Sequence, residues 1–188
     1  HSVLEVVKYL EKRGVKITII DVDKYGMVNP DDVMSAIQKD TFLVSIMYAN
    51  NEIGTIQLIS EIGKQVQKKG ILMHTDAVQA PGLLLLNINK LHVDLLSISG
   101  HKFYGPKGVG ALYVKRGTKL VPQTHGGGQE RGLRSGTENI SGIVGAAEAL
   151  VSSENKREKE VKSILKIFPY FFIIKHFENL VFKRIRRF

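Results

Sequence analysis

Three polar clusters in this sequence carry the side chains best suited to chemistry. They occupy residues 50–54, 76–79 and 99–102, and each follows a short apolar run of the kind that forms a buried strand. Open parallel α/β sheets bind their ligands beyond the carboxyl ends of their strands. We therefore expect the three clusters to lie along one edge of a sheet.

The second and third clusters contain an aspartate and a lysine, Asp76 and Lys102. A lysine can form a Schiff base with an aldehyde cofactor, and a carboxylate can keep the pyridine nitrogen of that cofactor protonated. Hydroxyls and backbone N–H groups near a helix start can bind a phosphate, while a side-chain amide can hydrogen-bond a ring hydroxyl. Neighbouring strand ends that carry Asp76 and Lys102 would meet these needs.

Taken singly, these residues have simpler explanations. Lys102 alone is typical of a solvated loop charge, and Asp76 of a turn or helix-cap residue. Asn50 and Asn51 are common turn formers. A glycine-rich loop over 125–132 fits either a phosphate contact or a plain connection.

One metal-binding interpretation also exists. His74 and Asp76 have the spacing of two ligands in a non-haem iron facial triad. This spacing is frequent by chance, and the sequence does not define the third ligand. We therefore expect no metal site.

The chain around these clusters alternates helical and strand patterns. Apolar residues at helical spacing predict a first helix that ends at Gly14, and Asn29, followed by a proline and two acids, is typical of a helix start. The other patterns predict strands over 15–21, 42–47, 71–75, 94–99 and 109–114 and helices over 59–69 and 142–162. Such alternation predicts an α/β fold with a mainly parallel sheet flanked by helices.

The composition is that of a globular chain without cysteine. Its 188 residues, 43% of them hydrophobic, suffice for one good-sized domain. The chain itself therefore contains no disulfide, no thiolate metal ligand and no cysteine nucleophile. No apolar run reaches the roughly 18 residues of a membrane span, and nothing indicates export, so we expect a cytoplasmic location.

The net charge of +9 lies mainly in the last part of the chain. Residues 151–188 hold ten Lys and Arg against four Glu, and residues 166–188 mix basic with aromatic side chains. Because the body is not unusually basic, we expect no nucleic-acid partner. The tail indicates either a divergent terminus, which we favour, or a basic amphipathic segment for a membrane surface.

Residues 1–150 resemble the class V aminotransferases, and within them the cysteine desulfurases that supply sulfur for iron–sulfur cluster assembly. The motifs that carry the resemblance are VSIM and NNEIG within 44–54, HTDAVQ at 74–79, SGHKFYGPKG at 99–108 and HGGGQERGLRSGT at 125–137. Each motif alone is modest. Their order and spacing together make the resemblance specific.

This resemblance implies the large cofactor-binding domain of a fold-type I pyridoxal 5'-phosphate enzyme, with the small domain missing. It also implies a homodimer that converts L-cysteine to L-alanine and transfers the sulfur to an iron–sulfur scaffold or another acceptor protein. Lys102 would be the catalytic lysine that forms the Schiff base. The other implied cofactor contacts are Asp76 at the pyridine nitrogen, Asn51 and Gln79 on the ring-hydroxyl side, Ser99 and His101 at the phosphate, and Thr137 at the phosphate of the neighbouring subunit.

The resemblance is incomplete at both ends of the chain. The family's upstream ring-stacking and phosphate-binding segment has no counterpart here, nor has the downstream small domain with its cysteine loop and substrate-binding arginine. We expect residues 1–150 to form a partial cofactor-binding domain, 151–165 to continue its last helix, and 166–188 to diverge. Such a fragment is expected to be inactive alone.

Two other interpretations remain open. The same cofactor could serve another class V enzyme, such as a selenocysteine lyase or a transaminase, although the motif at 131–137 favours the desulfurases. The chain could also be a non-catalytic relic or a binding module that keeps the fold without the chemistry.

Overall fold

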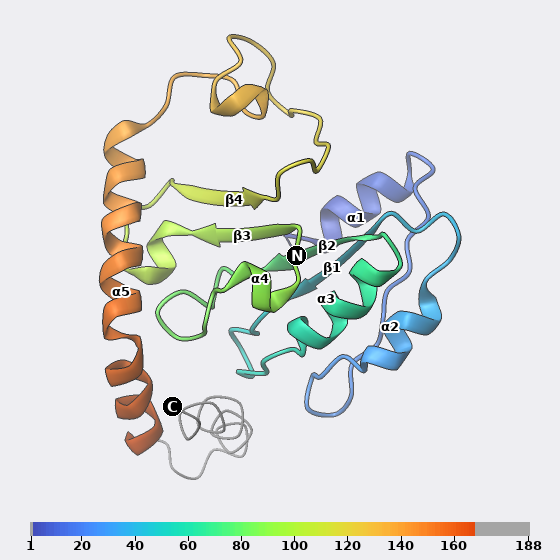
Figure 1. The fold of residues 1–188 in the computed structure, drawn as a ribbon, viewed down its shortest axis with the longest axis horizontal. Helices are drawn as coiled ribbons and strands as arrows, with labels where there is room; N and C mark the ends of the chain where they lie inside the picture. The colour runs from blue at the N-terminus through green and yellow to red at the C-terminus, as the bar shows by residue number, and fades with distance from the viewer. Residues whose placement is uncertain (1, 168–188) are drawn as a thin grey trace.

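The computed structural model describes residues 2–167 as a sheet surrounded by helices (Figure 1). Its strands lie across the sheet in the order β1 (Leu43–Met47), β2 (Leu72–Asp76), β3 (Leu95–Ser99) and β4 (Gly110–Val114). β1, β2 and β3 are parallel, whereas β4 runs antiparallel to β3. The expected α/β fold with a mainly parallel sheet is confirmed, and β4 is its antiparallel edge strand.

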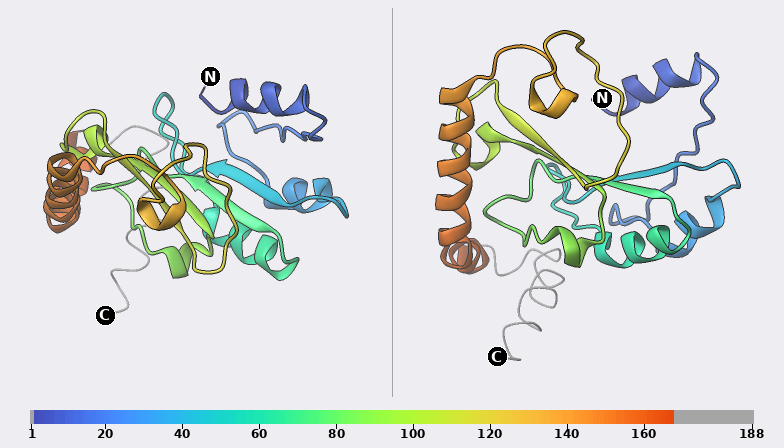
Figure 2. Two further views of the ribbon diagram at one scale, coloured as in Figure 1. Left: turned by 90° about the horizontal axis from the view of Figure 1, so that it is seen from above. Right: turned by 45° about the horizontal axis from the view of Figure 1, so that its top comes forward.

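The helices surround this sheet unevenly. They are α1 (Leu4–Glu11), α2 (Pro30–Ala36), α3 (Ile59–Lys68), α4 (Ile88–Leu91) and α5 (Ile140–Ile167), with the short 3-10 helices η1 (Gly100–Phe103) and η2 (Glu130–Gly132). α2, α3 and α4 lie on one side of the sheet, α1 on the other, and α5 stands across one end (Figure 2). None of the helices in residues 2–167 is long and apolar enough to cross a membrane.

Local sequence explains where two of these helices begin and end. The side chain of Asn29 accepts a hydrogen bond from the N–H of Asp31 at 3.0 Å, which caps α2 as the sequence predicts. α3 stops before Gly70, whose φ of +71° continues no helix. α5 extends over residues 151–165 as well. Beyond Ile167, the tail expected over 166–188 lies outside the described residues.

The hydrophobic core lies between α3 and the sheet. α3 buries the apolar residues that recur on one of its faces. β2 buries Met73 and Thr75, while His74 and Asp76 are only half-buried. Successive side chains of a strand point to opposite faces, so β2 presents one face to the core and a polar face to the other side of the sheet.

The strand predicted over residues 15–21 is wrong. Residues 15–20 form no strand, and only an isolated bridge joins Val22 to Val28. Ile20 packs against the core, but Ile19 is 69% exposed. A strand needs a neighbour for its hydrogen bonds, and this run finds none among residues 2–167.

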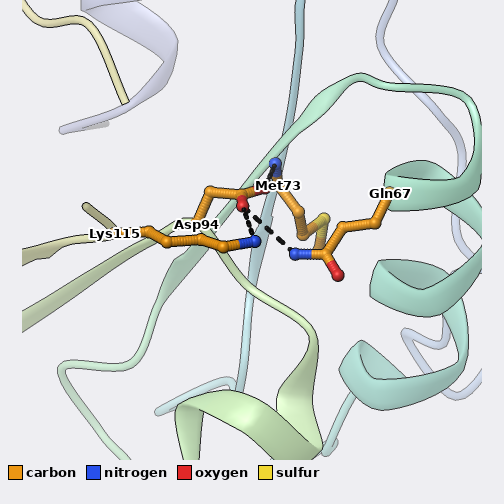
Figure 3. A network of polar contacts seen from close by, with 4 residues as sticks. All are labelled: Gln67, Met73, Asp94 and Lys115. Carbon is orange, nitrogen blue, oxygen red and sulfur yellow. Dashed lines mark hydrogen bonds and ion pairs between the residues drawn. The ribbon is translucent and has the colours of Figure 1, made fainter. Parts of the chain in front are cut away.

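A buried carboxylate joins β2, α3 and the end of β4 (Figure 3). Oδ2 of Asp94 accepts the backbone N–H of Met73 at 3.0 Å, and Oδ1 accepts Nε2 of Gln67 at 3.1 Å and Nζ of Lys115 at 2.9 Å. The Asp94 side chain is 8% exposed, whereas that of Lys115 is 50% exposed. Asp94 thereby satisfies three donors at the amino-terminal end of β3.

We predict that Asp94→Ala lowers the free energy of unfolding by about 3 kcal/mol, because it leaves a buried backbone N–H and an amide without an acceptor. Asp94→Asn should cost less, since one oxygen remains. Chemical denaturation measures both. Asp40→Ala is the matched control, because it removes an ion pair with Lys16 that lies in solvent. Equal unfolding midpoints for Asp94→Ala and Asp40→Ala would contradict the role given to Asp94.

Candidate functional site

The three polar clusters follow strands that end at one edge of the sheet. In the parallel register Met47 is paired with Asp76, and Asp76 with Ser97. Backbone bonds continue past the strand ends: Tyr48 donates to the carbonyl of Asp76 at 2.7 Å, and Ala77 donates to that of Ser97 at 3.0 Å. The predicted convergence of the clusters is confirmed.

Asp76, the last residue of β2, both closes a turn and keeps an oxygen available. Its Oδ1 accepts the N–H of Val78 at 3.0 Å, and Ala80 donates to the carbonyl of Ala77 at 2.9 Å. Its Oδ2 accepts no hydrogen bond from residues 2–167. The half-buried side-chain amide of Gln79 also makes no hydrogen bond with these residues. The turn therefore leaves one carboxylate oxygen and one amide without a hydrogen bond to these residues.

Lys102 lies on η1, directly after β3. Its side chain is exposed, and its Nζ makes no hydrogen bond or ion pair within the described part of the chain. Ser99 Oγ and His101 Nδ1 are hydrogen-bonded to each other at 3.0 Å, so a hydroxyl and an imidazole stand beside the lysine. Phe103 is 2% exposed and anchors this short helix in the interior.

A closed loop holds Lys102 in this position. Gly100 donates to the carbonyl of Val109 at 2.9 Å, and Gly105 donates to the carbonyl of Gly100 at 2.9 Å. Tyr104 between them has a φ of +66°, a left-handed conformation that few non-glycine residues adopt. A Cβ at position 105 would lie 2.8 Å from the carbonyl oxygen of Gly100, so the loop closes only around a glycine.

α5 supports both loops that carry the site. Its Gly145 lies so close to Pro106 that a Cβ would come within 2.9 Å of the proline ring. Farther along the helix, Glu154 accepts the N–H of Gly82 at 3.1 Å, and a Cβ on Gly82 would meet Ser153 at 2.9 Å. One rigid helix therefore contacts the segment after Asp76 and the segment after Lys102 (Figure 1).

The two asparagines of the first cluster have different surroundings. Asn50 Oδ1 accepts the N–H groups of Glu52 and Ile53 at 2.8 and 3.1 Å, so Asn50 is the turn former. Asn51 is exposed, and its Nδ2 donates only to Glu52 Oε1, at 2.7 Å. The structure leaves Asn51 as the more accessible amide, although no hydrogen bond joins it to the other expected site residues.

Thr137 stands apart from the strand-end residues. It lies in a loop held by its own contacts, among them the bond from the N–H of Gly136 to Gln129 Oε1 at 2.9 Å. In this loop Glu130 and Arg131 both have positive φ values, 49° and 59°. Thr137 is exposed, and no hydrogen bond joins its side chain to Ser99, His101 or Lys102. The structure therefore does not bring Thr137 together with the other expected phosphate contacts by a hydrogen bond.

The sequence analysis missed a polar row that crosses the sheet beside Asp76. His74 hydrogen-bonds through Nδ1 with Ser45 Oγ at 2.7 Å and through Nε2 with Ser97 Oγ at 2.9 Å. Burial lowers the pKa of His74, and the nearby charge of Asp76 opposes that shift. Period-two alternation around these residues was the signal that placed them on the polar face. No third metal ligand joins His74 and Asp76 among the described residues.

Comparison with known proteins places the chain in a family. The sequence profile of the aminotransferase class-V family matches residues 1–166.

The chain belongs to the class-V aminotransferase family.

Among its relatives in this family, the cysteine desulfurase IscS of Dictyoglomus turgidum is 52% identical over 171 residues, which are 91% of this chain and 43% of that protein. A solved NifS-like protein is 48% identical, with a TM-score of 0.84 over 87% of this chain and 46% of the other. A structure described as SspA in complex with cysteine is 39% identical, with a TM-score of 0.78 over 87% of this chain and 50% of the other. The resemblance seen in the motifs is confirmed, and the chain spans half or less of the length of these proteins.

We predict that Gly105→Ala opens the lysine loop of this class-V chain, because the new methyl group would press on the carbonyl of Gly100. Unfolding free energy should fall by about 1–3 kcal/mol. The amide of residue 100 should also lose protection in hydrogen exchange. Gly108→Ala is the control for the steric contact, because its Cβ would meet no atom within 4 Å. Its φ of +75° adds a left-handed backbone strain that Gly105 does not have, so this control alone also tests the effect of strain. Equal protection of residue 100 in the two variants would contradict this packing account.

Proposed function

We propose that this chain is part of a pyridoxal 5'-phosphate-dependent cysteine desulfurase, an enzyme that converts L-cysteine to L-alanine and passes the sulfur to an acceptor protein. The observation that carries the proposal is that Asp76 ends β2 and Lys102 follows the neighbouring parallel strand β3, at the same edge of the sheet. The names of the relatives, at 52% identity, support cysteine as the substrate.

The donors at this edge fit the proposed cofactor. Lys102 has an exposed amine that makes no hydrogen bond or ion pair with residues 2–167, which suits a covalent bond to an aldehyde carbon. Asp76 has a carboxylate oxygen that accepts no hydrogen bond in the described part of the chain and could bind a protonated ring nitrogen. The remaining proposed contacts are Asn51 and Gln79 to the ring hydroxyl, Ser99 and His101 to the phosphate, and Thr137 to the phosphate of a neighbouring subunit. Once bound, pyridoxal 5'-phosphate supplies an electron sink for bonds at the amino-acid α-carbon.

The protein's part in this chemistry is to bind and orient. Asp76 fixes the ring by its charge, and its bond to Val78 holds the carboxylate in place. Ser99 Oγ and His101 offer a phosphate a hydroxyl and an imidazole next to the N–H groups of η1. The closed loop sets the position of Lys102 relative to Ser99. The lysine that would bind the cofactor aldehyde and the hydroxyl that would bind its phosphate therefore keep a fixed relative position.

The proposed sulfur transfer needs a thiolate that these 188 residues do not contain, since they include no cysteine. We propose that residues 1–150 are part of the cofactor-binding domain, that a homodimer completes the site through Thr137, and that this chain alone transfers no sulfur. An iron–sulfur scaffold or another protein would take the sulfur. A cytoplasmic location is proposed because thiols stay reduced there.

We predict that borohydride reduction of the chain with pyridoxal 5'-phosphate attaches the cofactor to Lys102. Peptide mapping by mass spectrometry locates the modified lysine. Lys107→Ala is the matched control, because Lys107 is an exposed lysine on the same loop and its loss should leave the labelling unchanged. Predominant labelling of Lys107 or Lys90, or equal labelling of Lys102→Ala, would refute the proposed role.

A further inference from the structure

A row of three polar side chains crosses the polar face of the sheet. Ser45 on β1, His74 on β2 and Ser97 on β3 are joined by hydrogen bonds of 2.7 and 2.9 Å. Ser45 and His74 are paired in the strand register. The row therefore lies across the strands, as a cross-strand ladder does, and it fixes one imidazole between two hydroxyls.

This arrangement occupies both nitrogens of His74. A neutral imidazole has one donor and one acceptor nitrogen, and the two hydroxyls satisfy both. Burial lowers the pKa of His74, so the ring is neutral at neutral pH. A ring with both nitrogens bonded cannot turn without breaking a hydrogen bond. The imidazole is thus held neutral and in one orientation.

The row lies beside Asp76. His74 and Asp76 are two residues apart on β2, so their side chains share one face of the sheet. Ser97 is paired with Asp76 in the register between β2 and β3. The charge of Asp76 acts to raise the pKa of His74, against the effect of burial. The carboxylate and the imidazole therefore interact electrostatically, and the strands on both sides present hydroxyls to the ring.

We propose that His74, held between Ser45 and Ser97, is a positioning residue for Asp76. An imidazole bonded to both serines does not turn toward the carboxylate, and this leaves the charge of Asp76 to the ring nitrogen of the cofactor. The inference rests on the proposed function, since it assigns the ring nitrogen to Asp76. Its basis is the hydrogen-bonded row and its register with Asp76.

Ser97→Ala tests the inference. Without this hydroxyl, Nε2 of His74 is free to bond with Asp76 and compete with the cofactor. Pyridoxal 5'-phosphate should bind about three- to tenfold more weakly, the equivalent of one neutral hydrogen bond. The nitrogen resonance of ¹⁵N-labelled cofactor should move toward the unprotonated value. His74→Gln should behave similarly, because a glutamine amide can replace at most some of the hydrogen bonds that His74 makes with Ser45 and Ser97.

Ser35→Ala is the matched control, since it removes one serine hydrogen bond, to the carbonyl of Asp31 at 2.8 Å, in α2. This variant should leave cofactor affinity and the ¹⁵N resonance unchanged. If Ser97→Ala binds cofactor with an unchanged resonance, the inference is overturned while the proposed function stands. If the unaltered chain binds no cofactor, the proposed function fails and the inference fails with it.

A second measurement needs no cofactor. The pKa of His74, followed by NMR in the full chain, should fall further in Asp76→Asn, because the favourable negative charge is gone. An unchanged pKa would mean that the imidazole does not sense Asp76, and it would overturn the inference whatever the cofactor experiment gives.

Discussion

The carboxylate of Asp94 fixes where β3 begins relative to β2, and the geometry at the opposite ends of these strands follows from it. Asp94 binds the N–H of Met73 through its side chain at 3.0 Å and donates its own N–H to the carbonyl of Met73 at 2.8 Å. β2 and β3 are each five residues long. A parallel register fixed at one end therefore determines the other end, where Asp76 and Ser99 lie.

α5 fixes the loops as Asp94 fixes the strands. Small residues of this helix allow close contact with Pro106, and Glu154 binds the backbone at Gly82. Because a packed helix is stiffer than a loop, the segments after Asp76 and after Lys102 keep their relative positions. The outer edges of β1 and β4 pair with no strand in the described residues, which agrees with a chain that spans half or less of the length of its relatives.

Sequence patterns predicted the features of the fold that depend on neighbouring residues. Asn29 indicated its helix, and the apolar runs indicated parallel strands whose ends converge. The run over 15–21 failed as a strand because pairing depends on a distant partner. His74 was considered only as a metal ligand, since Ser45 and Ser97 lie 29 and 23 residues away along the chain. The cap of α2 depends only on residues that are adjacent in the sequence. A cross-strand row depends on the register of the strands, which bring together residues that are distant in the sequence.

The proposed function depends on Asp76 as the residue that would hold the cofactor ring. Its Oδ2, at the end of β2, accepts no hydrogen bond from residues 2–167. A titration of the chain with pyridoxal 5'-phosphate, followed by visible absorption, tests this most directly when Asp76→Ala is compared with Asp32→Ala on the surface of α2. The loss of a charged hydrogen bond should weaken binding about 10- to 100-fold in Asp76→Ala and alter the spectrum, with Asp32→Ala unchanged. Equal affinity and the same spectrum in both variants would contradict the proposed role of Asp76.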